Sequence, residues 1–396
     1  MATTTASKPG QTLRFEPAER GAALRQCSRC IMDTTDPQIQ FDEDGICNHC
    51  LAYDIRVSNE LFDKEEDRPR LEELIAEIKQ AGKGRDYDCI IGVSGGVDST
   101  MVAYTAIKHG LRPLAVHMDN GWNSELAVAN IERTLKTLGI DLYTHVVDWE
   151  EFRDLHLSFL KASVANSEIP TDHAIVAILY RLAAKQNVRF ILGGGNLATE
   201  GIMPASWMYD AKDLRFLKSV HRRFGKVKLK TFPTFTLGNF AYWTFAKRIR
   251  TIPILNYMHF NKQEAIGLFE RELGWRAYGG KHFESIYTRW FQAFVLPTKF
   301  GIDKRLAHLS SLIVSGQMTR EQALAEMGKP LYDAQMLRED ADFVMKKLGL
   351  NQSEFDEIMG SPVQTHRDFS SNELVLRRMP YMVKFVKKVA TNRLWE

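Results

Sequence analysis

The sequence lacks the features of a membrane or secreted protein. It has no run of about 18 or more uncharged apolar residues, the length that predicts a spanning helix. Its most apolar long stretch, FAYWTFAKRIRTIPILNYM, is interrupted by Lys247, Arg248 and Arg250. The first residues, MATTTASKPGQTLRFEPAERG, contain no apolar segment like that of a secretory signal. These absences predict a cytoplasmic protein without a membrane span, in which residues 1–24 form a flexible tail.

The chain also lacks a strong excess of charge. Its formal net charge is only +3, with 44% hydrophobic and 26% charged residues, which excludes a generally basic protein that coats nucleic acid. Its length of 396 residues is enough for two domains. Nucleic acid is therefore not an expected partner. One stretch, 212–230, holds eight Lys or Arg residues and one Asp. It could bind a diphosphate, an anionic partner or RNA, or simply form a solvated basic face.

Cysteine is scarce, and its placement is informative. Four of the five cysteines form the pairs CSRC and CNHC. Two CxxC pairs at this separation can supply four thiolates to one Zn²⁺ ion, which predicts a closed structural zinc site. A redox pair is the alternative, but it would leave the second matched pair unexplained. His49 lies between two of the ligands, and four sulfurs already complete the shell. The predicted ligands are Cys27, Cys30, Cys47 and Cys50.

The fifth cysteine, Cys89, lies inside an apolar run that predicts a buried strand. The chain therefore lacks an exposed thiol for hydrolysing glutamine or transferring sulfur. If the protein aminates a substrate, the ammonia must come from another polypeptide.

The middle of the chain alternates short apolar runs with amphipathic segments, and no repeat of fixed period occurs. This alternation predicts an α/β fold with a doubly wound parallel sheet. The predicted strands are 87–93, 111–119, 141–148 and 189–195. The predicted helices are 70–82, 98–110, 123–139, capped by Asn123 or Ser124, and 172–187, capped by Thr171 or Asp172. Thr319 with Gln322 predicts a capping box that starts a further helix. The predicted divisions are a zinc module at 25–53, a helical linker at 54–85, an ATPase domain at 86–260 and a mostly helical region at 261–396.

The first predicted strand runs into the loop VSGGVDST. Gly95 and Gly96 allow backbone N–H groups to approach an anion, and Ser94 and Ser99 add hydroxyl donors. The following helix N-terminus favours negative charge. Asp98 would repel a phosphate unless a cation lies between them, so we assign Asp98 to Mg²⁺. The loop is not a Walker A motif, because no Lys follows the glycines.

This loop resembles the SGGxDS signature of the PP-loop ATPases, in which it grips the pyrophosphate released from ATP. The resemblance implies ATP as cosubstrate and a nucleotide site after the second strand, around the backbone of Met118 in VHMDNGW. In the stretch LGGGNLATEG, the backbone at Gly194 and Gly195 could closely approach a bound ligand. A structural glycine turn explains these residues equally well. The nucleotide-binding residues expected from the loop itself are Ser94, Gly95, Gly96, Val97, Asp98 and Ser99.

The order of CxxC, CNHC, VSGGVDS, YGGKHFES and LPTKFGIDKR along the chain resembles the N-acetyl sugar amidotransferase family within the PP-loop ATPases. The resemblance implies that ATP, with Mg²⁺, adenylylates the acetamido oxygen of a nucleotide-linked sugar. Ammonia then displaces AMP to leave an acetamidino group, as in the making of bacterial surface polysaccharides such as lipopolysaccharide O-antigen, or of nonulosonic acids on flagella. It also implies partner proteins that deliver ammonia and resemble the glutaminase and cyclase subunits of histidine biosynthesis.

This chemistry requires a cation for the phosphate charge and a base for ammonia. The candidate cations are Lys281, Lys299, Lys304 and Arg305, and the candidate bases are His282 and Glu284. Two alternatives remain: a zinc-containing PP-loop enzyme that adenylylates tRNA, and a binding module that keeps the fold without catalysis. The absent reactive thiols argue against tRNA thiolation, and the intact Asp98 with its flanking serines argues against a non-catalytic module.

Overall fold

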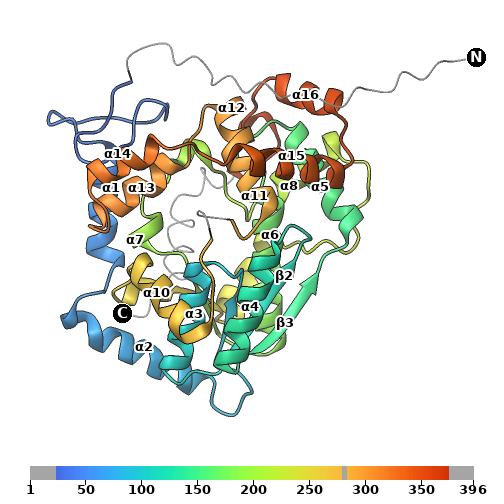
Figure 1. Ribbon diagram of the computed structural model, residues 1–396. Helices are drawn as coiled ribbons and strands as arrows, with labels where there is room; N and C mark the ends of the chain where they lie inside the picture. The colour runs from blue at the N-terminus through green and yellow to red at the C-terminus, as the bar shows by residue number, and fades with distance from the viewer. Residues whose placement is uncertain (1–23, 279–282, 374–396) are drawn as a thin grey trace, which may run out of the picture.

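The computed structural model describes residues 24–278 and 283–373 (Figure 1). The strands are β1 (Cys89–Gly92), β2 (Pro113–Asp119), β3 (Asp141–Val146), β4 (Phe190–Gly193) and β5 (Arg250–Pro253). The α-helices are α1 (Asn48–Glu60), α2 (Arg68–Ala81), α3 (Val97–Lys108), α4 (Glu125–Leu138), α5 (Trp149–Lys161), α6 (Ile169–Lys185), α7 (Leu197–Glu200), α8 (Leu214–Phe224), α9 (Leu237–Ala241), α10 (Lys262–Leu273), α11 (Ile286–Trp290), α12 (Leu296–Phe300), α13 (Arg305–Val314), α14 (Arg320–Met327), α15 (Ala334–Leu348) and α16 (Gln352–Gly360).

The strands form one parallel sheet in the order β3-β2-β1-β4-β5. This confirms the predicted doubly wound α/β class. The order reverses direction between β1 and β4, so the loops that follow these two strands meet at the carboxyl edge of the sheet. The strand β5 was not predicted, because RTIP is short and begins with a charged residue.

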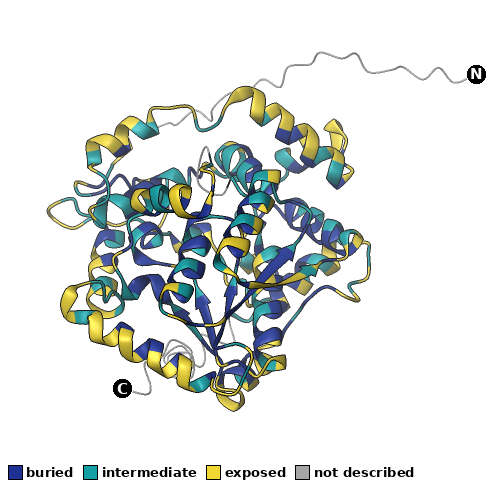
Figure 2. Ribbon diagram, turned by 60° about the horizontal axis from the view of Figure 1, so that its bottom comes forward, coloured by how far each residue is buried: buried dark blue, intermediate teal, exposed yellow. Residues whose placement is uncertain are grey.

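Helices cover both faces of the sheet, and its strands are mostly buried (Figure 2). One face packs against α2, α3, α4 and α10, with Ile131 and Phe269 in its core. The other face packs against α5, α6 and α8, with Phe159 and Leu217 in its core. The exception is β3 at the sheet edge, whose side chains are mostly exposed. Within the described residues, no helix is both long enough and apolar enough to cross a bilayer.

Several predicted helix ends are confirmed by their caps. The Ser124 hydroxyl accepts from the backbone N–H of Ala127, and Gly139 closes the same helix in a left-handed conformation. Thr319 and Gln322 form the reciprocal bonds of a capping box at the start of α14. These ends were predictable because they depend only on neighbouring residues.

The start of α6 differs from the prediction. The helix begins at Ile169, with Pro170 in its first turn, and Glu168 takes the cap position. Proline is well tolerated in a first turn, because its missing N–H would have no helical partner there. Asp172 is therefore a residue of the first turn, not a cap.

The cysteine module packs against the C-terminal helices. Arg320 of α14 donates from Nε to the Cys30 carbonyl (3.1 Å) and from Nη2 to Gln26 Oε1 (2.7 Å). Ser310 of α13 accepts from the N–H of Ile31 at 3.2 Å. Helix α1 starts inside the CNHC pair and runs on to Glu60, so the predicted boundary at 53/54 falls within a helix. The module is thus tied to helices almost 300 residues away in sequence.

Replacing Arg320 with Met should weaken this docking. The substitution leaves the Cys30 and Cys27 carbonyls and Gln26 Oε1 without their charged donor. This loss should lower the free energy of unfolding by about 1–3 kcal/mol in urea titrations. Arg338→Met, at an exposed position of α15, should change it by less than about 0.5 kcal/mol. Equal stability of the two variants would show that the module docks without the Arg320 contacts.

Candidate active site

The loop after β1 has the geometry of an anion cradle. Gly95 has φ +82°, and a Cβ at this position would lie 2.6 Å from the Ala127 carbonyl, so glycine is required. The Ser94 and Ser99 hydroxyls lie 3.2 Å apart. Gly96 caps α3, and no side chain caps that helix within the described residues. The N-terminus of α3 therefore faces the loop, where its aligned N–H groups and dipole favour a phosphate.

Two aromatic side chains hold this loop in place. The indole N–H of Trp275 donates to the Gly95 carbonyl at 2.9 Å, and the Tyr278 hydroxyl donates to the same oxygen at 3.0 Å. Burial is the largest cause that raises the pKa of Tyr278 to about 12, so its hydroxyl keeps its proton and remains a donor. Sequence analysis missed both residues. The only signal was that WRAY directly precedes the glycines of YGGKHFES.

The glycine-rich loop after β4 lies against the start of α3. A Cβ on Gly194 would lie 3.2 Å from the carbonyl carbon of Asp98. The Asn196 amide donates to Asp98 Oδ1 at 3.3 Å. A Cβ on Gly195, in contrast, would meet nothing within 4 Å. Gly194 therefore permits the two loops to touch, and a nucleotide contact of either glycine remains a prediction.

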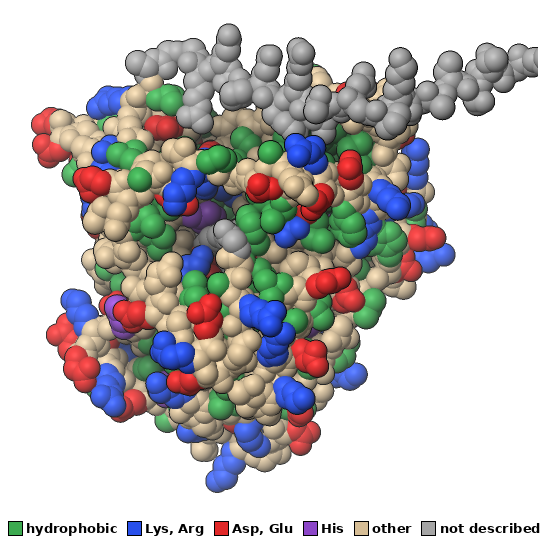
Figure 3. All heavy atoms as spheres, in the orientation of Figure 1, with side chains coloured by type: hydrophobic (Ala, Val, Ile, Leu, Met, Phe, Trp, Pro, Cys, Tyr) green, Lys and Arg blue, Asp and Glu red, His purple; other side chains and the backbone are tan. Residues whose placement is uncertain are grey.

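A cavity of about 610 Å³ opens beside the phosphate loop. Figure 3 shows this face of the molecule hollowed near its centre. The cavity reaches from Ser94 on the loop, past Met118 at the end of β2, to α6, α11 and α13. Its polar lining residues include Asn166, Glu168, Thr171, Asp172, Glu200, Thr288, Gln292, Lys304 and His308. Its depth and mixed lining are typical of a site for a small molecule with polar groups.

Asp172 is a carboxyl group of the cavity wall with a strongly shifted pKa. Much of its side-chain surface is accessible, but many protein atoms surround the carboxyl group. Burial, and secondarily the nearby charge of Glu168, raises the pKa of Asp172 to about 7, while Lys304 opposes the shift. Thr288 donates a hydrogen bond to Glu168. A carboxyl group that titrates near neutral pH is suited to accept and release protons.

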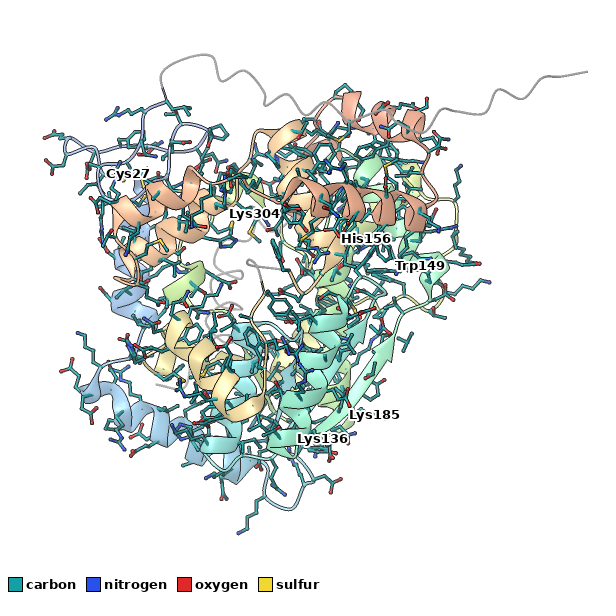
Figure 4. All side chains as sticks on the ribbon, viewed as in Figure 1. Cys27, Lys136, Trp149, His156, Lys185 and Lys304 are labelled. Atoms are coloured by element: carbon teal, nitrogen blue, oxygen red, sulfur yellow. The ribbon has the colours of Figure 1, made fainter. Side chains whose placement is uncertain are left out.

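Of the four predicted cations, the structure brings Lys304 to the cavity. Figure 4 places it near the middle of the molecule. Lys299 and Arg305 correct the prediction. The Lys299 ammonium donates to the carbonyls of Ile358 (2.6 Å), Met359 (3.0 Å) and Ser361 (2.6 Å), where it stabilises the end of α16. Arg305 pairs with Asp303 at 2.8 Å.

The predicted base Glu284 lies against the phosphate loop. A Cβ on Gly96 would approach Glu284 Oε1 to 3.3 Å, and the Glu284 carbonyl accepts from the N–H of Ser124. With Asp98, it places a second carboxylate where a phosphate is expected, which suits a bridging Mg²⁺ better than a bare anion. Lys281 and His282 lie outside the described residues, so their catalytic roles remain predictions.

The predicted zinc ligands come together. All four thiol sulfurs lie within 4.8 Å of one another and are fully buried. The Cys27–Cys50 and Cys30–Cys47 sulfur distances are 4.0 and 3.7 Å, close to the roughly 3.8 Å edge of a tetrahedron with 2.3 Å Zn–S bonds. His49 instead contacts Asp36 at 2.7 Å. The sulfurs thus fit zinc, which would hold the module together and take no part in chemistry.

The basic stretch 212–230 lies apart from the cavity. Its helix α8 buries Leu214, Phe216, Leu217 and Val220, and none of its residues lines the cavity. The structure gives this stretch no part in holding a diphosphate there. A role with a partner or RNA stays a prediction.

Residues 284–386 match the family model described as LPS biosynthesis protein WbpG-like, C-terminal domain. The C-terminal part of the chain is therefore similar to a WbpG-like domain. It contains Glu284, Lys304 and His308, so part of the cavity wall belongs to it. This finding agrees with the resemblance to N-acetyl sugar amidotransferases drawn from the motifs.

Other similarities are more limited. A glutamine-hydrolysing GMP synthase of Thermus thermophilus is 40% identical over 93 residues, which are 23% of this chain and 16% of that protein. The chain thus spans less than a fifth of the length of this curated relative. NMN synthetase from Francisella tularensis aligns with 71% of this chain and 95% of its own at 13% identity and a TM-score of 0.35. The NH3-dependent NAD synthetase from Campylobacter jejuni gives the same coverage and identity at 0.31. Structural likeness this distant carries no information about activity.

Replacing Cys47 with Ser should abolish zinc binding. Purified wild-type protein should carry about one zinc per chain by elemental analysis, as expected for four thiolates around one ion. The Cys47→Ser protein should carry almost none and unfold at lower temperature. Cys89→Ala is the matched control, because Cys89 is buried in β1 away from the cluster, and it should keep its zinc. Full zinc content in Cys47→Ser would contradict the site.

The raised pKa of Asp172 should appear in the pH dependence of stability. The folded state keeps this proton up to about pH 7, whereas the unfolded chain releases it near about 3.9. The contribution of Asp172 to the free energy of unfolding of the wild type therefore falls as the pH rises between these two values. Asp172→Asn cannot ionise, so its Tm relative to wild type should rise from pH 5 to pH 8. Asp342→Asn, exposed on α15, should show a flat difference. A flat difference for Asp172→Asn would contradict the shift.

Proposed function

We propose that this protein is an ATP-dependent amidotransferase that converts an acetamido group of a nucleotide-linked sugar into an acetamidino group. The observation that carries the proposal is the single cavity that connects the phosphate loop at Ser94 with Lys304 and Asp172. A reaction between ATP and a second, polar substrate requires this continuity. The WbpG-like domain supports the substrate class, because its model is described as an LPS biosynthesis protein.

The first step would activate the amide. The acetamido oxygen attacks the α-phosphate of ATP, the bond to the β-phosphate breaks, and pyrophosphate leaves while an O-adenylyl imidate forms. The loop Ser94–Ser99 would hold the departing pyrophosphate through backbone N–H groups and the two hydroxyls. Lys304 would stabilise the negative charge on the phosphate. Asp98 and Glu284 would hold Mg²⁺, which neutralises phosphate charge when bound.

The second step would replace oxygen by nitrogen. Ammonia attacks the imidate carbon, the C–O bond breaks, and AMP leaves, so that an amidine remains. The attacking nitrogen must lose a proton, and Asp172 is suited to accept it because its pKa lies near neutral. The chain itself has no suitable thiol for hydrolysing glutamine. Four of its five cysteines form the metal cluster, and burial raises the pKa of Cys89, which lies inside β1. Separate glutaminase and cyclase-like subunits would therefore supply ammonia.

Incubation with ATP, Mg²⁺, ammonium and acetamido UDP-sugars tests the proposal. We expect AMP, pyrophosphate and a sugar product lighter by about 1 Da, as O becomes NH. Lys304→Met should lower kcat/KM by about 100-fold, since it removes charge stabilisation at the phosphate. Lys329→Met, an exposed position on the loop after α14, should retain activity. Formation of ADP and phosphate would contradict the mechanism, and AMP release that requires RNA instead of a sugar would favour the tRNA alternative.

A further inference from the structure

A second cavity of about 530 Å³ lies on the opposite side of β2, between α4 and the sheet edge formed by β3. Figure 1 shows α4 beside these strands at the edge of the molecule. Adjacent residues on a strand point to opposite faces, so Met118 lines the main cavity while Asp119 lines the second. The second cavity is lined by His117, Asp119, Gly121, Asn123, Val128, Ile131, Glu132, Leu135, Leu142 and Thr144.

The two cavities share two residues, His117 and Asn123. His117 Nδ1 lies 3.0 Å from the Val93 carbonyl, which can only accept, so Nδ1 carries the proton. His117 Nε2 is then an acceptor, and the Asn123 amide donates to it at 3.1 Å. The two cavities thus meet at a side-chain pair joined by one hydrogen bond.

The lining of the second cavity indicates what enters it. Two carboxylates, Asp119 and Glu132, stand among aliphatic side chains, and its described lining includes no Lys or Arg. One cation, Lys347, contacts the rim, where its ammonium donates to the Gly121 carbonyl. Carboxylates of this kind repel ATP and sugar diphosphates and attract a small cation. Near neutral pH most ammonia, the nucleophile of the proposed reaction, is protonated to ammonium, which is a small cation.

We propose that the second cavity admits ammonium or ammonia and that the His117–Asn123 pair is the inner gate to the reaction cavity. This inference rests on the proposed function. The adenylylated sugar occupies the main cavity when ammonia is needed, and an open mouth there would let water hydrolyse this intermediate. A separate entrance beside the phosphate loop lets the small nucleophile arrive while the main cavity stays closed to solvent.

Filling the second cavity tests the entrance. Thr144 faces it, whereas the neighbouring Tyr143 points to the other face of the same exposed strand. Thr144→Trp should raise KM for ammonium about tenfold or more, with little change in sugar-dependent exchange of pyrophosphate into ATP. Tyr143→Trp is the matched control and should leave both unchanged. If the Thr144→Trp protein shows no pyrophosphate exchange and therefore has not folded, the smaller substitution Thr144→Leu takes its place.

The outcomes separate the two proposals. If wild-type protein exchanges no pyrophosphate with any acetamido sugar, the proposed function fails. If exchange is normal and a folded Thr144 variant retains wild-type KM for ammonium, the entrance is wrong while the proposed function stands.

Asn123→Ala tests the gate. It removes the amide donor and widens the passage, so methylamine should become a substrate that forms an N-methyl amidine, seen as a product about 14 Da heavier than the ammonia product. A variant that still excludes methylamine, although its ammonia-dependent turnover and pyrophosphate exchange are normal, would show that the pair is not a gate.

Discussion

The close approach of two glycine-rich loops at the carboxyl edge of the sheet underlies the whole site. The strand order reverses between β1 and β4, which brings the loops after these strands together. Contact is possible because Gly194 has no Cβ to meet Asp98. Asn196 then donates to the Asp98 carboxylate. A phosphate cradle on one loop and a polar amide on the other thus face the same space, and the cavity forms beside them.

The C-terminal half completes this edge from the other side. Trp275 and Tyr278 hold the Gly95 carbonyl, which orients the peptide units on either side of it. Helix α13, which follows Lys304, is held by the cysteine module through Ser310. Helix α1, which begins within the module, also contacts the end of α7, where Arg56 donates to the Gly201 carbonyl at 3.1 Å. A zinc ion in the module would in this way help to position the two helices that bring Lys304 and Glu200 to the cavity.

The sequence predicted what depends on local pattern and missed what depends on tertiary contact. Four strands, the phosphate loop, the four thiols and the capping box at Thr319 each follow from residues close together in the chain, and the structure confirms their positions. The strand β5 escaped notice because its pairing with β4 comes from the sheet and not from its own composition. The cations could not be sorted by sequence either, because Lys299 and Lys304 differ only in what the fold places opposite them.

Asp172 shows how a small difference in a helix boundary changes chemistry. As a helix cap its carboxylate would accept backbone N–H groups, which stabilise the ionised form and lower the pKa. Because Pro170 lets α6 begin at Ile169, Glu168 takes the cap position and Asp172 moves into the first turn, facing the cavity. There, burial and the neighbouring Glu168 charge favour the protonated form. A shift of about one helical turn in the cap thus turns a structural carboxylate into one that titrates near neutral pH, beside the cation and the phosphate loop that the proposed reaction requires.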